Sequence, residues 1–273
     1  MKNDEVGRQH FLIFHSSFII FNFINMKQAF VFILIFTSLN AFCQGEGEYK
    51  EPSKESLAYH DYRMYESTPP YGLTKIKKLI SEIKDKETEN GDEWEIALDN
   101  RVYNKLSLRE KFTYIMIHGE SYSQVCDFIP PPPDEQKKIF GFLPDVLSES
   151  TWSERQIKFL KDNRDSVMAL IKESSTRSKR MGVNYKRVIQ EINGVEMIPF
   201  LVKFYNEKKK DGDVLTLMLI LMKENNYGPF LSSTTYKKLY GEEYNFTAFI
   251  DYNKANEELI IKRATEFYNA RSK

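Results

Sequence analysis

The chain has 273 residues, with 39 basic and 39 acidic side chains and two cysteines. A net charge near zero argues against sequence-independent binding to nucleic acid, so no nucleic acid partner is expected. Because Cys43 lies at a predicted cleavage site, Cys126 has no internal partner, and this excludes a disulfide-stapled scaffold. The fold must therefore rest on a hydrophobic core, for which the chain is long enough.

Residues 26–43 have the features of a secretory signal peptide. Lys27 supplies a positive start, an apolar run follows, and Ala41 and Cys43 are small residues at positions −3 and −1 before Gln44. The segment resembles bacterial signal peptides, including those that leave Gln as the first mature residue. We expect cleavage before Gln44 and export to the periplasm or the exterior.

Residues 1–25 precede this signal and contain a second apolar run. One interpretation is that Met26 is the true start and residues 1–25 are an upstream artefact. Alternatively, residues 11–42 remain as a membrane anchor, since the pooled apolar run is long enough to span a bilayer. A third interpretation is lipidation of Cys43, although Phe42 stands where a lipoprotein signal has a small residue. A membrane partner is expected only in the last two cases.

The rest of the chain divides by composition. Four consecutive prolines fix the backbone dihedral φ and remove amide donors, so they favour a stiff linker over a helix. The predicted parts are a flexible Tyr-rich lead-in (44–71), an N-terminal helical subdomain (72–129), the proline linker (130–133) and a C-terminal helical domain (134–273).

Helical patterns dominate after residue 72, where apolar residues at helical spacing predict a helix from Thr74. Ser107 and Glu110 form a capping box that opens another helix, and Gly119 is placed to end it. The alternation in residues 94–98 predicts a short strand or extended segment.

A second capping box, formed by Thr151 and Glu154, predicts a helix to about Lys172. Its apolar stripe is interrupted at Asn163 and Arg164, which predicts either local exposure or a polar group held in the core.

Residues 174–182 predict a loop, and the basic stretch 177–187 is expected to be solvated. Asn184 is placed to cap the following helix. Residues 214–222 are apolar apart from Thr216 and have no period, which indicates a central helix buried on all sides.

The predicted fold class is all-α, with packed pairs of short amphipathic helices and at most one small β element. The arrangement is expected to be an orthogonal bundle or a short HEAT-like solenoid. Residues 195–224 resemble one unit of a HEAT-type repeat, with Pro199 in the first helix, Asp211 in the turn and Val214 opening the second. No second unit with this spacing is found.

His118, Cys126 and Asp127 are the residues that suggest nucleophilic catalysis, because such an enzyme pairs a thiolate with a base and an orienting group. They support the hypothesis of a hydrolase built on the Cys126/His118 pair. A structural role explains the same residues, since imidazole is favoured at helix ends and a lone cysteine is common packing.

Tyr59, Tyr62, Arg63 and Tyr65 have the composition of a recognition surface. The alternative is that these side chains dock the N-terminal arm onto the helical body. No metal site is predicted, since the mature part holds only His60 and His118 as imidazoles. No cofactor motif is found.

These observations favour an exported, non-enzymatic binding or structural protein of the bacterial envelope, whose partner is an envelope protein or a glycan. The alternatives are the Cys126/His118 hydrolase and a membrane-anchored accessory subunit.

Overall fold

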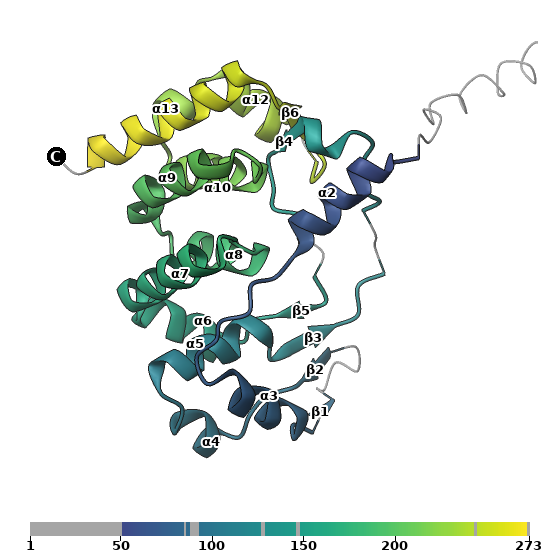
Figure 1. The fold of residues 1–273 in the computed structure, drawn as a ribbon, viewed down its shortest axis with the longest axis vertical. Helices are drawn as coiled ribbons and strands as arrows, with labels where there is room; N and C mark the ends of the chain where they lie inside the picture. The colour runs from purple at the N-terminus through teal and green to yellow at the C-terminus, as the bar shows by residue number, and fades with distance from the viewer. Residues whose placement is uncertain are drawn as a thin grey trace, which may run out of the picture. The chain divides into compact units, whose positions relative to one another are not determined.

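The computed structural model describes residues 51–84, 86–87, 93–126, 129–145, 148–242 and 245–271. This part of the chain is mainly helical, as predicted, with a few short antiparallel strands (Figure 1). The strands form two small sheets rather than the single β element expected. None of the helices in the described ranges combines the length and the apolar character needed to span a bilayer.

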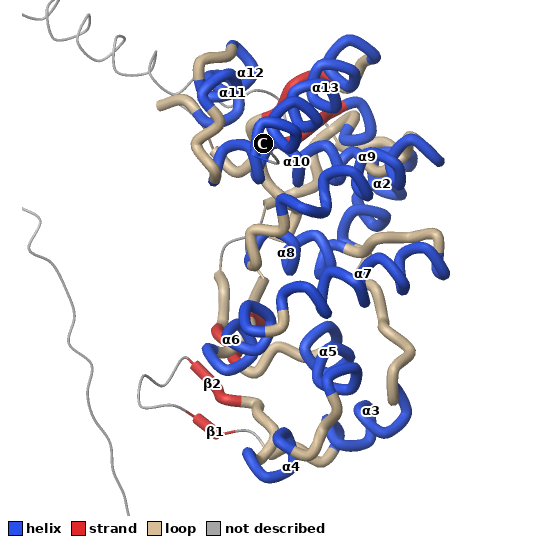
Figure 2. Tube along the Cα trace, turned by 90° about the vertical axis from the view of Figure 1, so that its left-hand side faces the viewer, coloured by secondary structure: helices blue, strands red, loops and turns tan. Residues whose placement is uncertain are grey.

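The helices are α2 (Lys54–Met64), α3 (Leu73–Ser81), α4 (Asn100–Asn104), α5 (Leu108–Ile117), α6 (Glu154–Asp162), α7 (Arg164–Ser178), α8 (Val183–Glu191), α9 (Ile198–Lys208), α10 (Gly212–Glu224), α11 (Gly228–Leu231), α12 (Thr234–Tyr240) and α13 (Lys254–Arg271), with 3-10 turns η1 (Glu135–Lys137) and η2 (Val195–Met197). From α6 to α12 the helices follow one another with short connections, whereas longer segments join α3 to α4 and α5 to α6. Figures 1 and 2 show them in successive layers, from α3 and α4 at one end to α12 and α13 at the other.

Two antiparallel sheets complete the fold. The larger has the order β1-β2-β3-β5, and the smaller pairs β4 with β6. The strands are β1 (Lys86–Glu87), β2 (Glu93–Glu95), β3 (Ser121–Ser123), β4 (Lys138–Phe140), β5 (Ser150–Thr151) and β6 (Phe249–Asp251).

Helix α10 lies at the centre of the core. Every residue of 214–222 is buried, and α10 contacts α8, α9, α13 and β4. This confirms the central helix predicted from the run of apolar residues without a period. The one polar residue of the run, Thr216, donates a hydrogen bond to the carbonyl oxygen of Phe140 at 2.9 Å, so its burial leaves no unpaired hydroxyl.

The capping predictions were right at one helix and wrong at another. Ser107 and Glu110 form the predicted capping box at the start of α5. At α6, however, Ser153 is the cap and Gln156 its partner. Thr151 cannot cap the helix because it lies in β5, where it pairs with Ser121 of β3.

The polar residues that interrupt the predicted stripe mark a helix boundary. Asn163 leaves the helical region, with φ −112° and ψ 26°, so α6 ends there and α7 begins at Arg164. Helix α7 then continues to Ser178, through most of the segment predicted as a loop. It ends at Lys179, whose φ of 57° lies in the left-handed region.

Helix α2 occupies the segment predicted to be a flexible lead-in, so that prediction is wrong for residues 54–64. Ser53 caps the helix by accepting a hydrogen bond from the amide of Ser56. The buried residues of α2 are Ser56 and Arg63, both polar. A helix whose buried face is polar produces no apolar stripe, and this is why the pattern missed it.

Arg63 holds α2 against the core through a buried ion cluster. Its side chain is 5% exposed, and its Nε lies 3.0 Å from both carboxylate oxygens of Asp213 on α10. A further N–H group donates to Glu135 of η1, and the guanidinium lies 4.1 Å from the ring centroid of Phe140. These carboxylates raise the pKa of Arg63 against the opposing effect of burial, so the buried charge is fully paired.

Tyr59 and His60 extend this contact. His60 Nδ1 lies 3.0 Å from Glu135 Oε2, and the Tyr59 hydroxyl accepts a hydrogen bond from the amide of Gly212 at 3.2 Å. Burial, with the charge of Asp213, raises the pKa of Tyr59. Tyr59 therefore docks α2 onto the start of α10, and His60 docks it onto η1.

The segment that follows α2 is fixed by the start of α8. Ser67 accepts a hydrogen bond from the amide of Gly182 at 2.8 Å, and the Asn184 side chain bonds both the amide and the carbonyl of Ser67. A Cβ on Gly182 would lie 2.2 Å from the Ser67 nitrogen, so only glycine fits there. Asn184 was predicted to cap α8, but Gly182 occupies that position.

Residues from Glu51 onward form one compact unit, and one core cluster contains side chains from Ile76 to Phe267. The cluster therefore includes residues on both sides of the four prolines. The division into two helical parts at 130–133 stays a prediction.

The Arg63 cluster predicts a large effect on stability. Arg63→Met should lower the free energy of unfolding by about 3–5 kcal/mol, because it leaves buried Asp213 without its counter-charge and buried Glu135 with His60 as its remaining partner. Urea unfolding measures this. The control is Arg109→Met, which breaks the exposed pair with Glu173 and should cost much less. Equal losses in the two variants would contradict the structural role assigned to Arg63.

Candidate functional site

No contact joins His118 to Cys126, the predicted catalytic pair, in the described part of the chain. His118 caps the end of α5, where its Nε2 contacts the carbonyl of Ile96 and its ring lies 5.2 Å from that of Tyr114. Cys126 is exposed, and no hydrogen bond connects its sulfur to the imidazole. Asp127 lies outside the described residues. The geometry gives the hydrolase hypothesis no support.

The four predicted binding residues fall into two groups. Tyr59 and Arg63 dock α2 onto the body, which is the alternative that the sequence left open. Tyr62 is half-buried and Tyr65 is 39% exposed. Arg180 lies over both rings, with its guanidinium carbon 4.6 Å and 3.5 Å from their centroids. Only Tyr62 and Tyr65 remain candidates for contact with a partner.

Two neighbouring cavities of about 220 and 160 Å³ share Arg187 of α8 and form what we call the Arg187 cleft. The side chains that give the cleft its chemistry come from five separate segments of the chain. They are Glu66, His118, Asp145, Trp152, Asn184, Gln190, Lys223 and Glu224, with hydroxyls from Ser148 and Ser150.

Arg187 is held in place from two sides. Its guanidinium carbon lies 4.9 Å from the ring centroid of Trp152, and its Nε lies 3.1 Å from Oδ2 of Asp145. Trp152 is itself fixed, because its indole N–H donates to the carbonyl of Ile115 at 3.0 Å. The cleft therefore presents a preorganised cation beside an aromatic wall.

Three carboxyl groups of the cleft, those of Asp145, Glu66 and Glu224, have pKa values raised chiefly by desolvation. Burial raises the pKa of Asp145, with Arg187 opposing the shift. Asp145 Oδ2 is buried and, despite the nearby Nε, makes no hydrogen bond to any described residue. Glu66 lies at the exposed rim, where close packing around its carboxyl and the charge of Asp145 raise its pKa. Carboxyls with perturbed pKa in a cleft are a recognised mark of functional sites.

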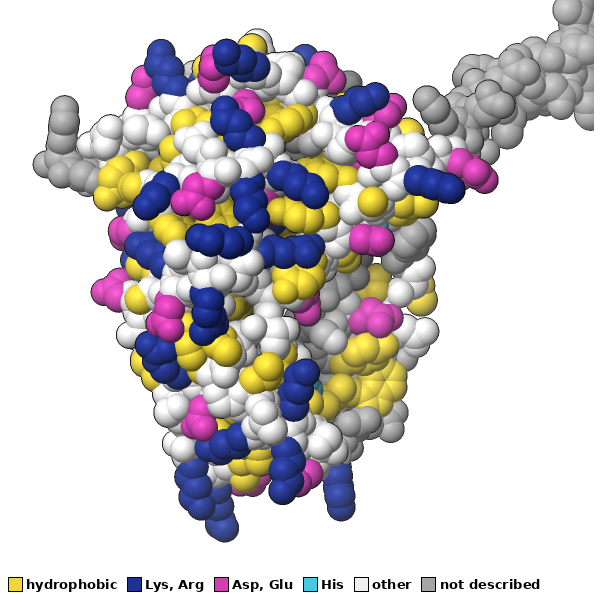
Figure 3. Space-filling view, in the orientation of Figure 1, with side chains coloured by type: hydrophobic (Ala, Val, Ile, Leu, Met, Phe, Trp, Pro, Cys, Tyr) yellow, Lys and Arg dark blue, Asp and Glu magenta, His cyan; other side chains and the backbone are white. Residues whose placement is uncertain are grey.

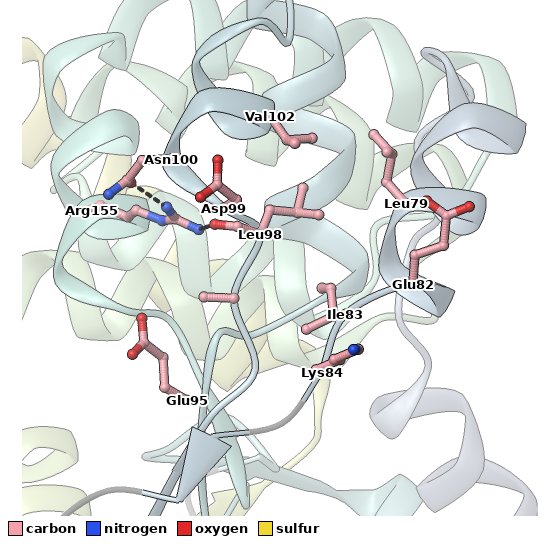
Figure 4. A pocket seen from close by; sticks show the side chains of 11 residues that line it. Leu79, Glu82, Ile83, Lys84, Glu95, Leu98, Asp99, Asn100, Val102 and Arg155 are labelled. Carbon is pink, nitrogen blue, oxygen red and sulfur yellow. Dashed lines mark hydrogen bonds between the residues drawn. The ribbon is translucent and has the colours of Figure 1, made fainter.

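A larger cleft of about 680 Å³ lies beside α3 and α4 (Figure 4). Its cation, Arg155, is already bound by Glu120, the Asn100 side chain and the carbonyl of Leu98. Asp99 at its edge caps α4. Because each arm of Arg155 is engaged within the fold, whereas the buried Oδ2 of Asp145 has no hydrogen-bond partner among the described residues, we assign the main site to the Arg187 cleft.

The described residues contain no group of three or more His, Cys, Asp or Glu side chains placed to hold a metal ion. The predicted processing residues Ala41, Cys43 and Gln44 lie outside the described residues.

The sequence did not identify the residues of the Arg187 cleft. Arg187 and Lys186 belong to the stretch predicted to be a solvated loop, but both lie in α8. Lys186 is 1% exposed and pairs with Asp211 at 2.8 Å. Glu66, Asp145 and Trp152 follow no spacing motif, because separate segments bring them together. Of the candidate catalytic and binding residues named from the sequence, His118 is the one that lines this cleft.

Comparison with known proteins gives no relative. No family model matches the chain, and no curated protein or solved structure matches it significantly. A function must therefore be argued from the site's own geometry and chemistry.

The raised pKa of Asp145 predicts a pH-dependent contribution to stability. This contribution is fully present below the ordinary pKa of about 3.9 and is lost as pH rises through the higher folded-state value. The free energy of unfolding of the wild type relative to that of Asp145→Asn should therefore be largest near pH 3 and should fall as pH rises towards 7. Urea unfolding across this range measures the difference. The control, Asp165→Asn, alters a side chain that is 96% exposed, and a similar pH dependence there would contradict the assignment.

Proposed function

We propose that this protein is exported and binds a glycan of the bacterial envelope in the Arg187 cleft, without catalysis. The observation that carries the proposal is the meeting of Asp145, Arg187 and Trp152 in a cleft rich in amides and hydroxyls.

The composition of the cleft suits a sugar better than an apolar ligand. Each sugar hydroxyl is both a donor and an acceptor, so it requires both kinds of group nearby. Gln190 and the two serines offer both, the carboxyls accept, and Arg187 donates. Asn184 lines the cleft, but its side chain is engaged by Ser67, Met116 and Tyr185. One face of the half-buried Trp152 ring lies against Arg187, and the opposite face is the apolar wall proposed for the C–H face of a pyranose. A combined volume of roughly 400 Å³ is within the range of small-ligand sites.

The same cleft gives little reason to propose catalysis. His118 is the residue in it best suited to act as a base at neutral pH, and one of its ring nitrogens is already engaged by the Ile96 carbonyl. Cys126, the predicted nucleophile, does not line the cleft.

The layered helices support a HEAT-like arrangement as part of this proposal. Helices α7 and α8, α9 and α10, and α12 and α13 lie in successive layers (Figures 1 and 2), and α10 contacts both α8 and α13. In such a solenoid each pair packs on its neighbours and leaves surface for binding. The cleft lies where the layer of α7 and α8 meets the loops from β4 and β5.

Glycan binding can be followed through Trp152. The chain has two tryptophans, so Trp94→Phe leaves Trp152 as the only indole. We expect a saturable fluorescence change with an N-acetylglucosamine tetramer or a soluble peptidoglycan fragment. In this background Arg187→Lys should weaken binding by about 10-fold or more, because it removes the planar hydrogen-bonding fork.

The matched control is Arg164→Lys, since Arg164 bonds backbone carbonyls at the end of α8, away from the cleft. Failure of both glycans to bind, or equal effects of the two Lys variants, would contradict the glycan proposal. Cleavage of a glycan that depends on Glu66 or Asp145 would contradict the non-catalytic part.

Export is tested by the intact mass of the protein from fractionated cells. We expect a soluble species that begins at Gln44. A chain that begins at Cys43 with added acyl mass would show a lipoprotein instead. A membrane-bound chain that keeps residues 26–43 would favour the anchored subunit.

A further inference from the structure

A second surface carries exposed cations beside tyrosine rings. We call it the basic surface and define it by Tyr62, Tyr65, Lys179, Arg180, Lys208 and Lys210. Figure 3 shows Lys and Arg side chains gathered across the middle of the face that carries α2 in Figure 1. Since the whole chain has no net charge, a local excess of cations is a feature to be explained.

The ends of two helices build this surface. Helix α7 ends at Lys179 and α9 at Lys209, both in the left-handed conformation. The two ends lie together, because Lys208 Nζ donates to the Lys179 carbonyl at 3.2 Å. Cations at helix C-termini are favoured by the helix dipole, which explains part of the accumulation.

The dipole does not explain how Arg180 is held. Its guanidinium lies 3.5 Å from the Tyr65 ring centroid and 4.6 Å from that of Tyr62, and it donates to the Tyr62 carbonyl at 3.2 Å. The ammonium of Lys210 lies 5.1 Å from the Tyr62 centroid. Cation–π contacts fix these charges without neutralising them.

The cations of the basic surface have no carboxylate partner. Among the described residues, no Asp or Glu oxygen lies within 4.0 Å of the charged nitrogens of Lys179, Arg180, Lys208 or Lys210. Lys209, between two of them in sequence, pairs with Glu257 at 2.8 Å. The surface therefore keeps uncompensated positive charge.

We propose that the basic surface binds an acidic segment of a partner protein. Arg180 presents a preorganised donor fork to a carboxylate, the lysines supply charge on both sides, and the tyrosines add rigid contact area at low entropic cost. Charge complementarity of this kind mainly sets the association rate and the choice of partner.

Two other polyanions fit the surface less well. A glycan needs open aromatic faces, but Arg180 covers Tyr65, and Tyr62 lies between Tyr59, stacked at 6.1 Å, and the cations. A membrane needs apolar side chains to insert. The exposed Leu57 and Met64 point from α2 in a direction roughly 150° away from Tyr62 at 100° per residue.

The test uses a fluorescein-labelled octaglutamate peptide and fluorescence anisotropy with the purified protein. We expect saturable binding that weakens as salt rises, since exposed charges are screened. The double variant Lys208→Gln/Lys210→Gln should bind about 2- to 30-fold more weakly, because it removes two exposed charges. The matched control is Lys237→Gln/Lys238→Gln on α12, which removes the same charge elsewhere and should keep wild-type affinity.

Three results would overturn the proposal. An equal loss in the two double variants would show attraction to overall charge alone. An octaglutamine peptide that binds as well as octaglutamate would remove the role of charge. Tighter binding to phosphatidylglycerol vesicles, lost in Lys208→Gln/Lys210→Gln, would assign the surface to a membrane. None of these results bears on the Arg187 cleft, whose ligand is tested separately.

Discussion

The burial of one guanidinium imposes the strongest constraint on this structure. Arg63 is almost fully removed from water, where an unpaired charge would be prohibitively costly. Its charge is tolerated because α10 brings Asp213 and η1 brings Glu135 to the same point. Arg63 is the one residue that pairs with both carboxylates in the described chain, so the three segments depend on one another. The hydrophobic core alone would not specify where α2 lies, because the buried side of α2 is polar.

The position of α2 in turn decides the position of the Arg187 cleft. The chain leaves α2 along the segment that Gly182, Val183 and Asn184 bind, and the Val183 amide donates to the Tyr65 carbonyl at 2.9 Å. These contacts carry Glu66 to the rim of the cleft and Tyr65 to Arg180. One short segment therefore takes part in both proposed binding surfaces. The start of α8 holds it in place, and Arg187 projects from the next turn of the same helix.

Sequence patterns predicted the elements whose burial is apolar or whose caps are local. The run at 214–222 and the capping box at Ser107 are of this kind, because the signal lies within a few neighbouring residues. Helix α2 was missed because polar partners far along the chain stabilise it. The cleft could not have been predicted from spacing, since Glu66, Asp145 and Arg187 meet only after the chain folds. Asn184 shows the same limit, as its local pattern indicated a cap but its side chain bonds a residue 117 positions earlier.

The distance along the chain between Arg63 and Asp213 also sets an order of events. The two residues are 150 positions apart, and a ribosome makes Arg63 long before Asp213. Until α10 emerges, Glu135 is the only one of the two carboxylates that Arg63 can meet, and a short helix is marginal alone. The first element of the described chain is therefore among the last to settle.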